Sequence, residues 1–120
     1  MAGPETRVDK KIIDALTARG AYVEKIHGSE YQNAGIPDLV GFIDGFGFGI
    51  EVKNPKKKAS AFKASEREAI ASLRAEGVKC GSAGGCTKLQ ASRIRRIIRT
   101  GNKAGVATSV DEALDILFGE

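Results

Sequence analysis

The clearest alternation of apolar and polar positions lies between residues 36 and 53, where the sequence reads IPDLVGFIDGFGFGIEVK. Two apolar runs, LVGFI and FGFGIEV, flank the dipeptide Asp44-Gly45, and an Asp-Gly pair between apolar runs predicts a tight β-hairpin. This turn sets the register so that Ile43 faces Phe46. Because side chains alternate between the two faces of a strand, six apolar residues share the core-facing side: Leu39, Ile43, Phe46, Phe48, Ile50 and Val52.

Apolar residues at helical spacing predict four amphipathic helices, over residues 4–20, 65–76, 88–100 and 109–120. Short apolar runs predict two more strands, over 21–27 and 103–108. Ser65 with Glu68, and Ser109 with Glu112, have the spacing of capping boxes at the starts of two helices.

The helix over 88–100 is expected to bury an apolar face made by Leu89, Ile94, Ile97 and Ile98. The glycine-rich segment 78–87 is expected to be a mobile connection between two helices. Strands and helices in this order indicate an α/β domain.

The composition limits the partners and surroundings of the protein. The 120 residues suffice for one domain, and Lys plus Arg number 19 against 15 Asp plus Glu, a net charge of +4 that suits a polyanionic partner. We expect a reduced cytoplasmic protein, because there is neither a signal peptide nor an apolar run near the ~20 residues of a membrane span. Cys80 and Cys86, with His27 as the single histidine, do not make a zinc site. We interpret both cysteines as incidental, with a disulfide or redox role as the alternative.

Three charged residues share the other face of the predicted hairpin. Asp38 faces Glu51 across the strands, and Lys53 lies one pleat further along. Facing side chains have Cβ atoms ~4.5–5.5 Å apart, and like charges at this distance repel each other. A divalent cation held between the two carboxylates would offset the repulsion, so the hairpin is a candidate active site. The alternative is the solvated face of an ordinary amphipathic hairpin.

Further polar residues are candidates for the same site. Glu5, in the first helical turn, is either a third carboxylate aimed at the hairpin or a residue that complements the helix dipole. Gln90 lies on the apolar side of its helix and needs a hydrogen-bond partner there. The lysine, a water or a phosphate would serve, and a backbone contact is the alternative. The polar loop over 28–37 offers candidate binding contacts in Tyr31, Gln32 and Asn33.

Two basic segments are candidate phosphate contacts. One follows the hairpin and contains Lys56, Lys57, Lys58 and Lys63. The other lies on the helix over 88–100 and contains Arg93, Arg95, Arg96 and Arg99. We expect the DNA contacts to be made by Lys56, Lys57, Lys58, Arg93 and Arg96. Ordinary solvated surfaces are the alternative.

The order of motifs is itself informative. A helix with an early glutamate leads to a strand, then to GIPDL, a tight turn and IEVK; TKLQ later opens a helix, and AGVATSVDEAL lies near the end. This order resembles the VRR-NUC family, the virus-type replication-repair nucleases of the PD-(D/E)xK superfamily, over nearly the whole chain. The resemblance implies a restriction-endonuclease-like fold with a small mixed β-sheet flanked by helices. The smallest stand-alone members are typical of phages and prophages.

The resemblance also implies roles for the residues of the hairpin. Asp38 and Glu51 would bind a divalent metal, with the backbone carbonyl of Val52 helping. Glu5 matches the acidic residue of the family's first helix and would be a further metal ligand. Lys53 would orient or activate the attacking water and stabilise the developing charge.

One departure from the family lies between the hairpin and the later motifs. Family members have a short linker there, whereas this chain has residues 54–87 with a helix of their own. We interpret this segment as an insertion within a single domain over 1–120. Gln90 matches the family's helix glutamine, and Glu66 is a rival placement for that motif position.

Together these features predict a Mg²⁺- or Mn²⁺-dependent DNA endonuclease that acts on branched DNA, in the manner of a homodimeric Holliday-junction resolvase. A two-fold dimer would present two sites for paired cuts. The expected location is the cytoplasm of a bacterial cell or of a phage-infected host. The alternatives are a flap or restriction-type nuclease and a non-catalytic DNA-binding module. The number of metal ions stays open.

Overall fold

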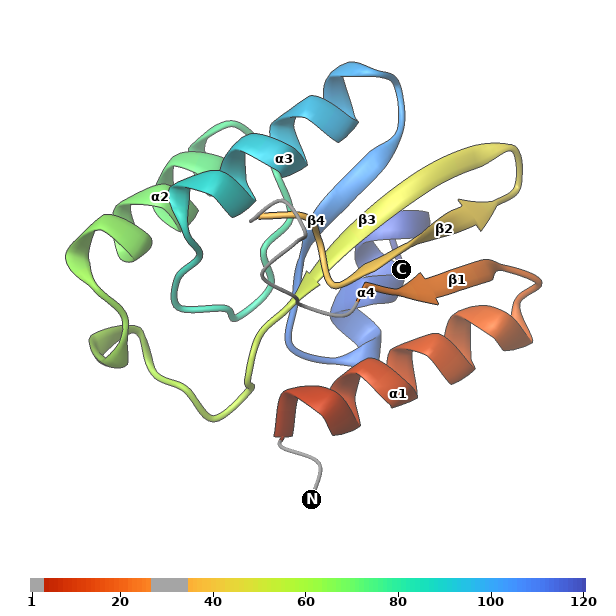
Figure 1. The fold of residues 1–120 in the computed structure, drawn as a ribbon, viewed down its shortest axis with the longest axis horizontal. Helices are drawn as coiled ribbons and strands as arrows, with labels where there is room; N and C mark the ends of the chain where they lie inside the picture. The colour runs from red at the N-terminus through yellow and green to blue at the C-terminus, as the bar shows by residue number, and fades with distance from the viewer. Residues whose placement is uncertain (1–3, 27–34) are drawn as a thin grey trace.

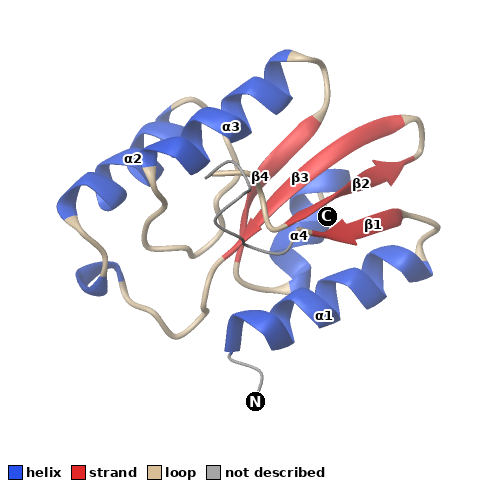
Figure 2. Ribbon diagram, in the orientation of Figure 1, coloured by secondary structure: helices blue, strands red, loops and turns tan. Residues whose placement is uncertain are grey.

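The protein folds around a four-stranded mixed sheet with strand order β1-β2-β3-β4, seen in a computed structural model that describes residues 4–26 and 35–120 (Figures 1 and 2). Strands β1, β2 and β3 are antiparallel neighbours, and β4 runs parallel to β3. The elements in chain order are α1 (Pro4–Ala18), β1 (Tyr22–Lys25), β2 (Leu39–Ile43), β3 (Phe46–Val52), the 3₁₀ turn η1 (Ala59–Ala61), α2 (Ala64–Ala75), α3 (Lys88–Arg99), β4 (Lys103–Ala107) and α4 (Val110–Phe118).

The predicted hairpin and its register are confirmed. Ile43 pairs with Phe46 across the turn, and Leu39 pairs with Ile50 at the other end. Asp44 and Gly45 have φ values of 50° and 84°. Positive φ at both central residues is what a type I′ turn requires, and Asp-Gly adopts it readily. The local sequence therefore determines which side chains face the core.

Helices cover both faces of the sheet. On one face α1 and α4 pack against the apolar side of the hairpin, with Ile12, Leu16, Ile50 and Leu117 fully buried. Burial of a side chain of this size contributes roughly 1.5–3 kcal/mol. On the opposite face a second core joins α2, α3 and β4, through Ile70, Leu73, Ile94 and Val106. Glu51 pairs in register with Val106 and so points toward this second core, beneath α3.

The segment over 78–87 is packed, and the expectation of a mobile connection is wrong. Cys80, Ala83 and Cys86 are buried in the second core, and both cysteines are free thiols. A Cβ atom at Gly85 would come within 2.7 Å of the Phe62 ring. The small residues that made the segment look mobile instead allow its backbone to approach its neighbours closely.

One helix start and one capping box differ from the prediction. Helix α2 begins after Lys63, not after Ser65, because the Glu66 carboxylate accepts a hydrogen bond from the Lys63 backbone N–H at 2.9 Å. Ser109 does cap α4, accepting from the Glu112 backbone N–H. The Glu112 carboxylate, however, accepts from the Thr108 and Ser82 N–H groups and does not complete a capping box.

The buried face of α3 also differs from the prediction. Ala91 and Ile94 are buried and Ile97 is half-buried, whereas Leu89 is 53 % exposed and Ile98 is exposed. The helix is rotated so that Gln90, one residue after Leu89, turns toward the sheet. Among the described residues, no helix is long and apolar enough to cross a membrane.

Candidate active site

The open end of the hairpin brings Asp38 and Glu51 together. Asp38 precedes β2 directly, and its backbone carbonyl accepts a hydrogen bond from the Ile26 N–H at 2.7 Å. Its carboxylate Oδ2 accepts from the Val52 N–H at 2.9 Å. The carboxylate is therefore held against the end of β3, beside Glu51.

Glu51 is the most unusual residue of the site. It is only 3 % exposed, and its Oε2 accepts a hydrogen bond from Gln90 Nε2 at 2.8 Å. Its other oxygen, Oε1, is buried and has no hydrogen-bond partner within the described part of the chain. Burial, followed by the negative charge of Asp38, raises the pKa of Glu51 to about 8, and Lys53 opposes the rise.

Gln90 connects Glu51 of β3 with Lys53, which follows the strand directly. Its Oε1 accepts from Lys53 Nζ at 3.0 Å, while its Nε2 donates to Glu51. Lys53 Nζ itself lies 3.6 Å from Glu51 Oε2. The partner that a buried glutamine requires is thus the Glu51–Lys53 pair. Glu66, the rival for this motif position, is engaged at the start of α2.

Thr87 fixes the position of Gln90 and was missed in the sequence. Its hydroxyl accepts from the Gln90 backbone N–H at 3.0 Å, and its own N–H donates to Gln90 Oε1 at 2.8 Å. These reciprocal bonds form a capping box at the start of α3. The Thr-x-x-Gln spacing in TKLQ was the signal for it.

The chemistry of these donors fits a hard divalent cation. Mg²⁺ and Mn²⁺ prefer carboxylate oxygens, and the unpartnered Glu51 Oε1 is a buried acceptor beside a second carboxylate. A cation there would offset both the burial and the like-charge repulsion. Within residues 4–26 and 35–120, no group of three or more His, Cys, Asp or Glu side chains is placed to hold a metal. The described site therefore contributes two carboxylates.

For several of the candidate residues the structure gives no test of the predicted role. Glu5 lies in the first turn of α1, but its side chain is outside the described part of the chain. His27, Tyr31, Gln32 and Asn33 also lie outside the described residues. Val52 is buried and its N–H donates to Asp38, while the role of its carbonyl stays a prediction.

The basic segment after β3 borders a cavity. Lys56, Lys57 and Lys58 are exposed, and the last two line a hollow of about 510 Å³ between the 55–59 loop, α2 and residues 82–84. Arg67 and Arg74 also line it, and none of the described residues that line it is acidic, although the Glu112 carboxylate accepts a hydrogen bond from the N–H of its lining residue Ser82. These two arginines were missed because they come from a different part of the sequence. Lys63 does not line the cavity.

The arginines of α3 separate into different environments. Arg93 and Arg96 line a hollow of about 360 Å³ together with Ile36 and Pro37, next to Asp38 in the sequence. Arg95 instead forms an ion pair with Glu76 at 2.8 Å. The predicted pair is thus adjacent to the start of β2, and Arg95 is engaged elsewhere.

A comparison with solved structures finds a chain titled "VRR_NUC domain". The alignment covers 92 % of this chain and 90 % of that chain, with a TM-score of 0.59 and 21 % sequence identity. The protein has the VRR_NUC fold. The predicted fold class, a small mixed sheet flanked by helices, is confirmed by this match and by the sheet topology. No protein-family model matches the sequence, and neither does any of the curated proteins compared with it.

Proposed function

We propose that the protein is a divalent-metal-dependent endonuclease of the PD-(D/E)xK type that hydrolyses phosphodiester bonds in branched DNA. The observation that carries this proposal is the buried Glu51 carboxylate, with an unpartnered oxygen, between Asp38 and a Gln90–Lys53 pair. A buried carboxylate is destabilising unless something compensates for its charge. The fold shared with a VRR_NUC domain supports the same conclusion.

Asp38 and Glu51 would hold Mg²⁺ or Mn²⁺, with the Val52 carbonyl and Glu5 as further proposed ligands. When bound, the cation lowers the pKa of a coordinated water and neutralises charge on the phosphate. The other contributions come from residues of the chain itself.

Lys53 is the proposed group that stabilises developing charge. Its ammonium has three N–H donors, of which Gln90 Oε1 takes one. Glu51 Oε2, 3.6 Å away, attracts a second donor, and the third is left for the attacking water or a non-bridging phosphate oxygen. A fixed cation next to the extra negative charge of the pentacovalent transition state lowers the barrier. Gln90 is a positioning residue, because it holds the ammonium beside Glu51.

The proposed path of the DNA follows the positive surface next to the site. Lys56, Lys57 and Lys58 follow Lys53 after two intervening residues, and the cavity that two of them line adds Arg67 and Arg74. Cations that converge on one cavity favour an anionic ligand such as backbone phosphate. Arg93, one turn after Gln90, is a second proposed contact, and Arg96 lies one turn farther from the site. We further propose a homodimer, which would supply two sites for paired cuts in a junction.

The test is cleavage of a labelled four-way junction, a 5′ flap and a linear duplex, each with Mg²⁺, Mn²⁺ or EDTA. Paired symmetric nicks in the junction, in metal only, are expected. Loss of one transition-state contact costs about 10²–10³-fold in rate, so Lys53→Ala and Asp38→Ala should cut at least this much more slowly. Lys10→Ala, an exposed lysine on α1, is the matched control.

Circular dichroism and DNA affinity in EDTA decide whether the variants are merely unfolded. Both properties should match the wild-type protein in Lys53→Ala. Preferential cutting of the flap or of the duplex would instead identify the protein as a flap or restriction-type nuclease. Metal-independent binding with no cutting of any substrate would instead leave a non-catalytic DNA-binding module.

A further inference from the structure

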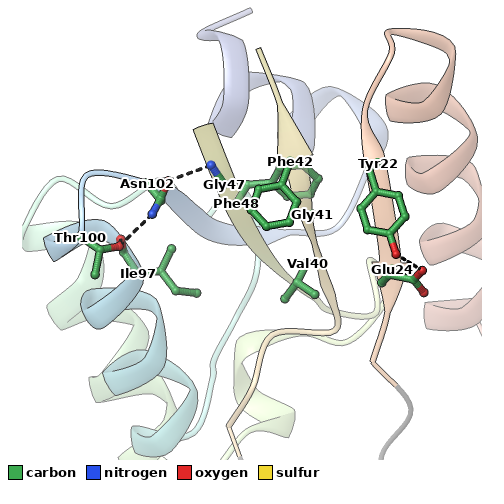
Figure 3. Close-up of a pocket in the computed structure, with 10 residues that line it drawn as sticks. All are labelled: Tyr22, Glu24, Val40, Gly41, Phe42, Gly47, Phe48, Ile97, Thr100 and Asn102. Atoms are coloured by element: carbon green, nitrogen blue, oxygen red, sulfur yellow. Dashed lines mark hydrogen bonds between the residues drawn. The ribbon is translucent and has the colours of Figure 1, made fainter. Parts of the chain in front are cut away.

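Half of the α3 face of the sheet carries exposed aromatic side chains. Helix α3 packs over β3 and β4, whereas Tyr22 on β1 and Phe42 on β2 are 59 % and 65 % exposed. The two residues pair directly in the strand register. Figure 3 shows them side by side on neighbouring strands, with α3 on the opposite side of the view. Clustered aromatic residues on an exposed face are typical of interaction surfaces.

A hollow of about 260 Å³ lies between these aromatic residues and α3. Gly47 also lines it, and a Cβ there would lie 3.3 Å from Asn102 Oδ1 and 3.5 Å from the Phe42 ring. The α3 side is formed by Ile97, Thr100 and Asn102 (Figure 3). Asn102 is held by hydrogen bonds with the Gly47 N–H at 2.8 Å and the Thr100 hydroxyl at 2.9 Å. The hollow is therefore preformed in the single chain.

The surface has the shape of a step, with α3 as the raised half and β1–β2 as the low half. We propose that a second copy of the chain covers it, related by a two-fold axis parallel to the strands. Each α3 would then lie over the uncovered strands of the other copy. A two-fold interface must be self-complementary. A sheet of which α3 covers one half meets this condition, because the covered half of one copy faces the uncovered half of the other.

The charges on the two halves are complementary. Glu24 lines the hollow on the β1 side and Arg96 lines the adjoining hollow on the α3 side; the two hollows share Val40, Ile97 and Thr100. Glu24 Oε1 accepts from the Tyr22 hydroxyl at 2.6 Å, which leaves its second oxygen for an arginine. The two-fold arrangement brings Arg96 of one copy toward Glu24 and the aromatic rings of the other. Guanidinium groups bind carboxylates and stack on aromatic rings.

This inference rests on the homodimer of the proposed function and identifies the surface through which the two copies bind. It does not depend on the chemistry at Glu51. It assigns Arg96 to the subunit interface and leaves Arg93 as the DNA contact on α3. A second copy fits better than an unpaired DNA strand. Within the described part of the chain, the residues that line the hollow beside Tyr22 and Phe42 include no basic side chain, and the carboxylate of Glu24 among them repels phosphate.

The experiment is the molar mass of the protein in solution over a wide range of concentration, by light scattering after size exclusion. Wild-type protein is expected at twice 12.7 kDa. Phe42→Glu should be a folded monomer, because the side chain is exposed in the single chain. Leu89→Glu, which alters another exposed apolar residue that does not line the hollow, should remain a dimer.

A charge exchange tests the proposed orientation. Glu24→Arg and Arg96→Glu should each weaken dimerisation by ~10-fold or more, and the double variant should recover most of the loss, as expected for a direct ion pair. A dimer that persists in Phe42→Glu would overturn the surface while leaving a dimeric nuclease intact. A wild-type monomer whose affinity for single-stranded DNA falls in Phe42→Glu would overturn the second-copy proposal, and the cleavage assay would still test the nuclease independently.

Discussion

Replacement of Glu51 by glutamine is expected to stabilise the metal-free protein at neutral and alkaline pH. Glutamine has nearly the shape of glutamate, and its oxygen can still accept the hydrogen bond from Gln90 Nε2. Its amide nitrogen would lie where Oε1 has no hydrogen-bond partner within the described residues, next to the Asp38 carboxylate. Glu51→Gln therefore removes a buried negative charge and supplies a donor to its neighbour.

The pH range and size of the effect follow from the pKa of Glu51, raised from 4.5 to about 8. Because the folded protein favours the protonated carboxyl group, its stabilising contribution is complete below pH 4.5 and is lost as pH rises through 8. At about 1.36 kcal/mol per pH unit, the whole rise corresponds to about 5 kcal/mol. This is a large share of the roughly 5–15 kcal/mol that stabilise a typical domain.

The assay is urea unfolding followed by circular dichroism, at several pH values between 4 and 9 in EDTA. Titrating groups away from the site contribute equally to both proteins, so the difference in unfolding free energy reports on Glu51 together with Asp38 and Lys53, to which it is coupled. This difference should grow in favour of Glu51→Gln from pH 4.5 to 8 and then level off. Parallel pH curves for the two proteins would refute the reasoning.

Mg²⁺ provides the second half of this test. A ligand that binds only the folded state stabilises it by about 2.7 kcal/mol at a hundredfold excess over Kd. Mg²⁺ should therefore raise the unfolding free energy of the wild-type protein at pH 8 and raise that of Glu51→Gln much less. Equal stabilisation of both proteins would place the cation elsewhere.

Two further predictions concern the neighbours of the site. Thr87→Val should lose about 0.5–2 kcal/mol of unfolding free energy, because the helix cap is removed. It should also lower kcat, because Gln90 is no longer held toward Lys53. Thr87→Ser should restore both properties, and a fall in stability at unchanged kcat would show that Thr87 has a structural role alone. Lys58→Gln should lower the slope of log DNA affinity against log salt by about 1 in EDTA, as for one lost phosphate contact, whereas Lys10→Gln on α1 should leave it unchanged. Equal slopes for the two variants would remove the 54–63 segment from the DNA path.

The parts of the fold that were predictable from the sequence depend on local interactions. The Asp44-Gly45 turn needs only two residues with positive φ, and the alternation on either side then determines the register. The approach of Asp38 to Glu51 follows from that register. Helix positions were predictable for the same reason, from periodicity along a single segment.

The errors arose where distant segments decide the outcome. Cys80, Ala83 and Cys86 are buried because the small residues of the 78–87 segment fit against Phe62 and α2, which no local pattern indicates. The cavity lined by Lys57 and Arg67 joins residues that are apart in the sequence. Thr87 is different, because its capping-box spacing with Gln90 is local and was recognisable in the sequence.

The strongest physical argument for a cation-dependent function is that Glu51 is a poor choice for stability alone. Its neighbours Ile50 and Val52 are apolar and buried, and an apolar residue at 51 would face a second core that already contains Val106 and Ile94. Replacement of buried charges by well-packed apolar residues is often neutral or stabilising. The chain instead places a carboxylate there, sets Asp38 beside it, and uses Gln90 to hold one of its oxygens and the Lys53 ammonium. Local choices that reduce stability are expected where function requires them, and a bound cation would stabilise both carboxylates together.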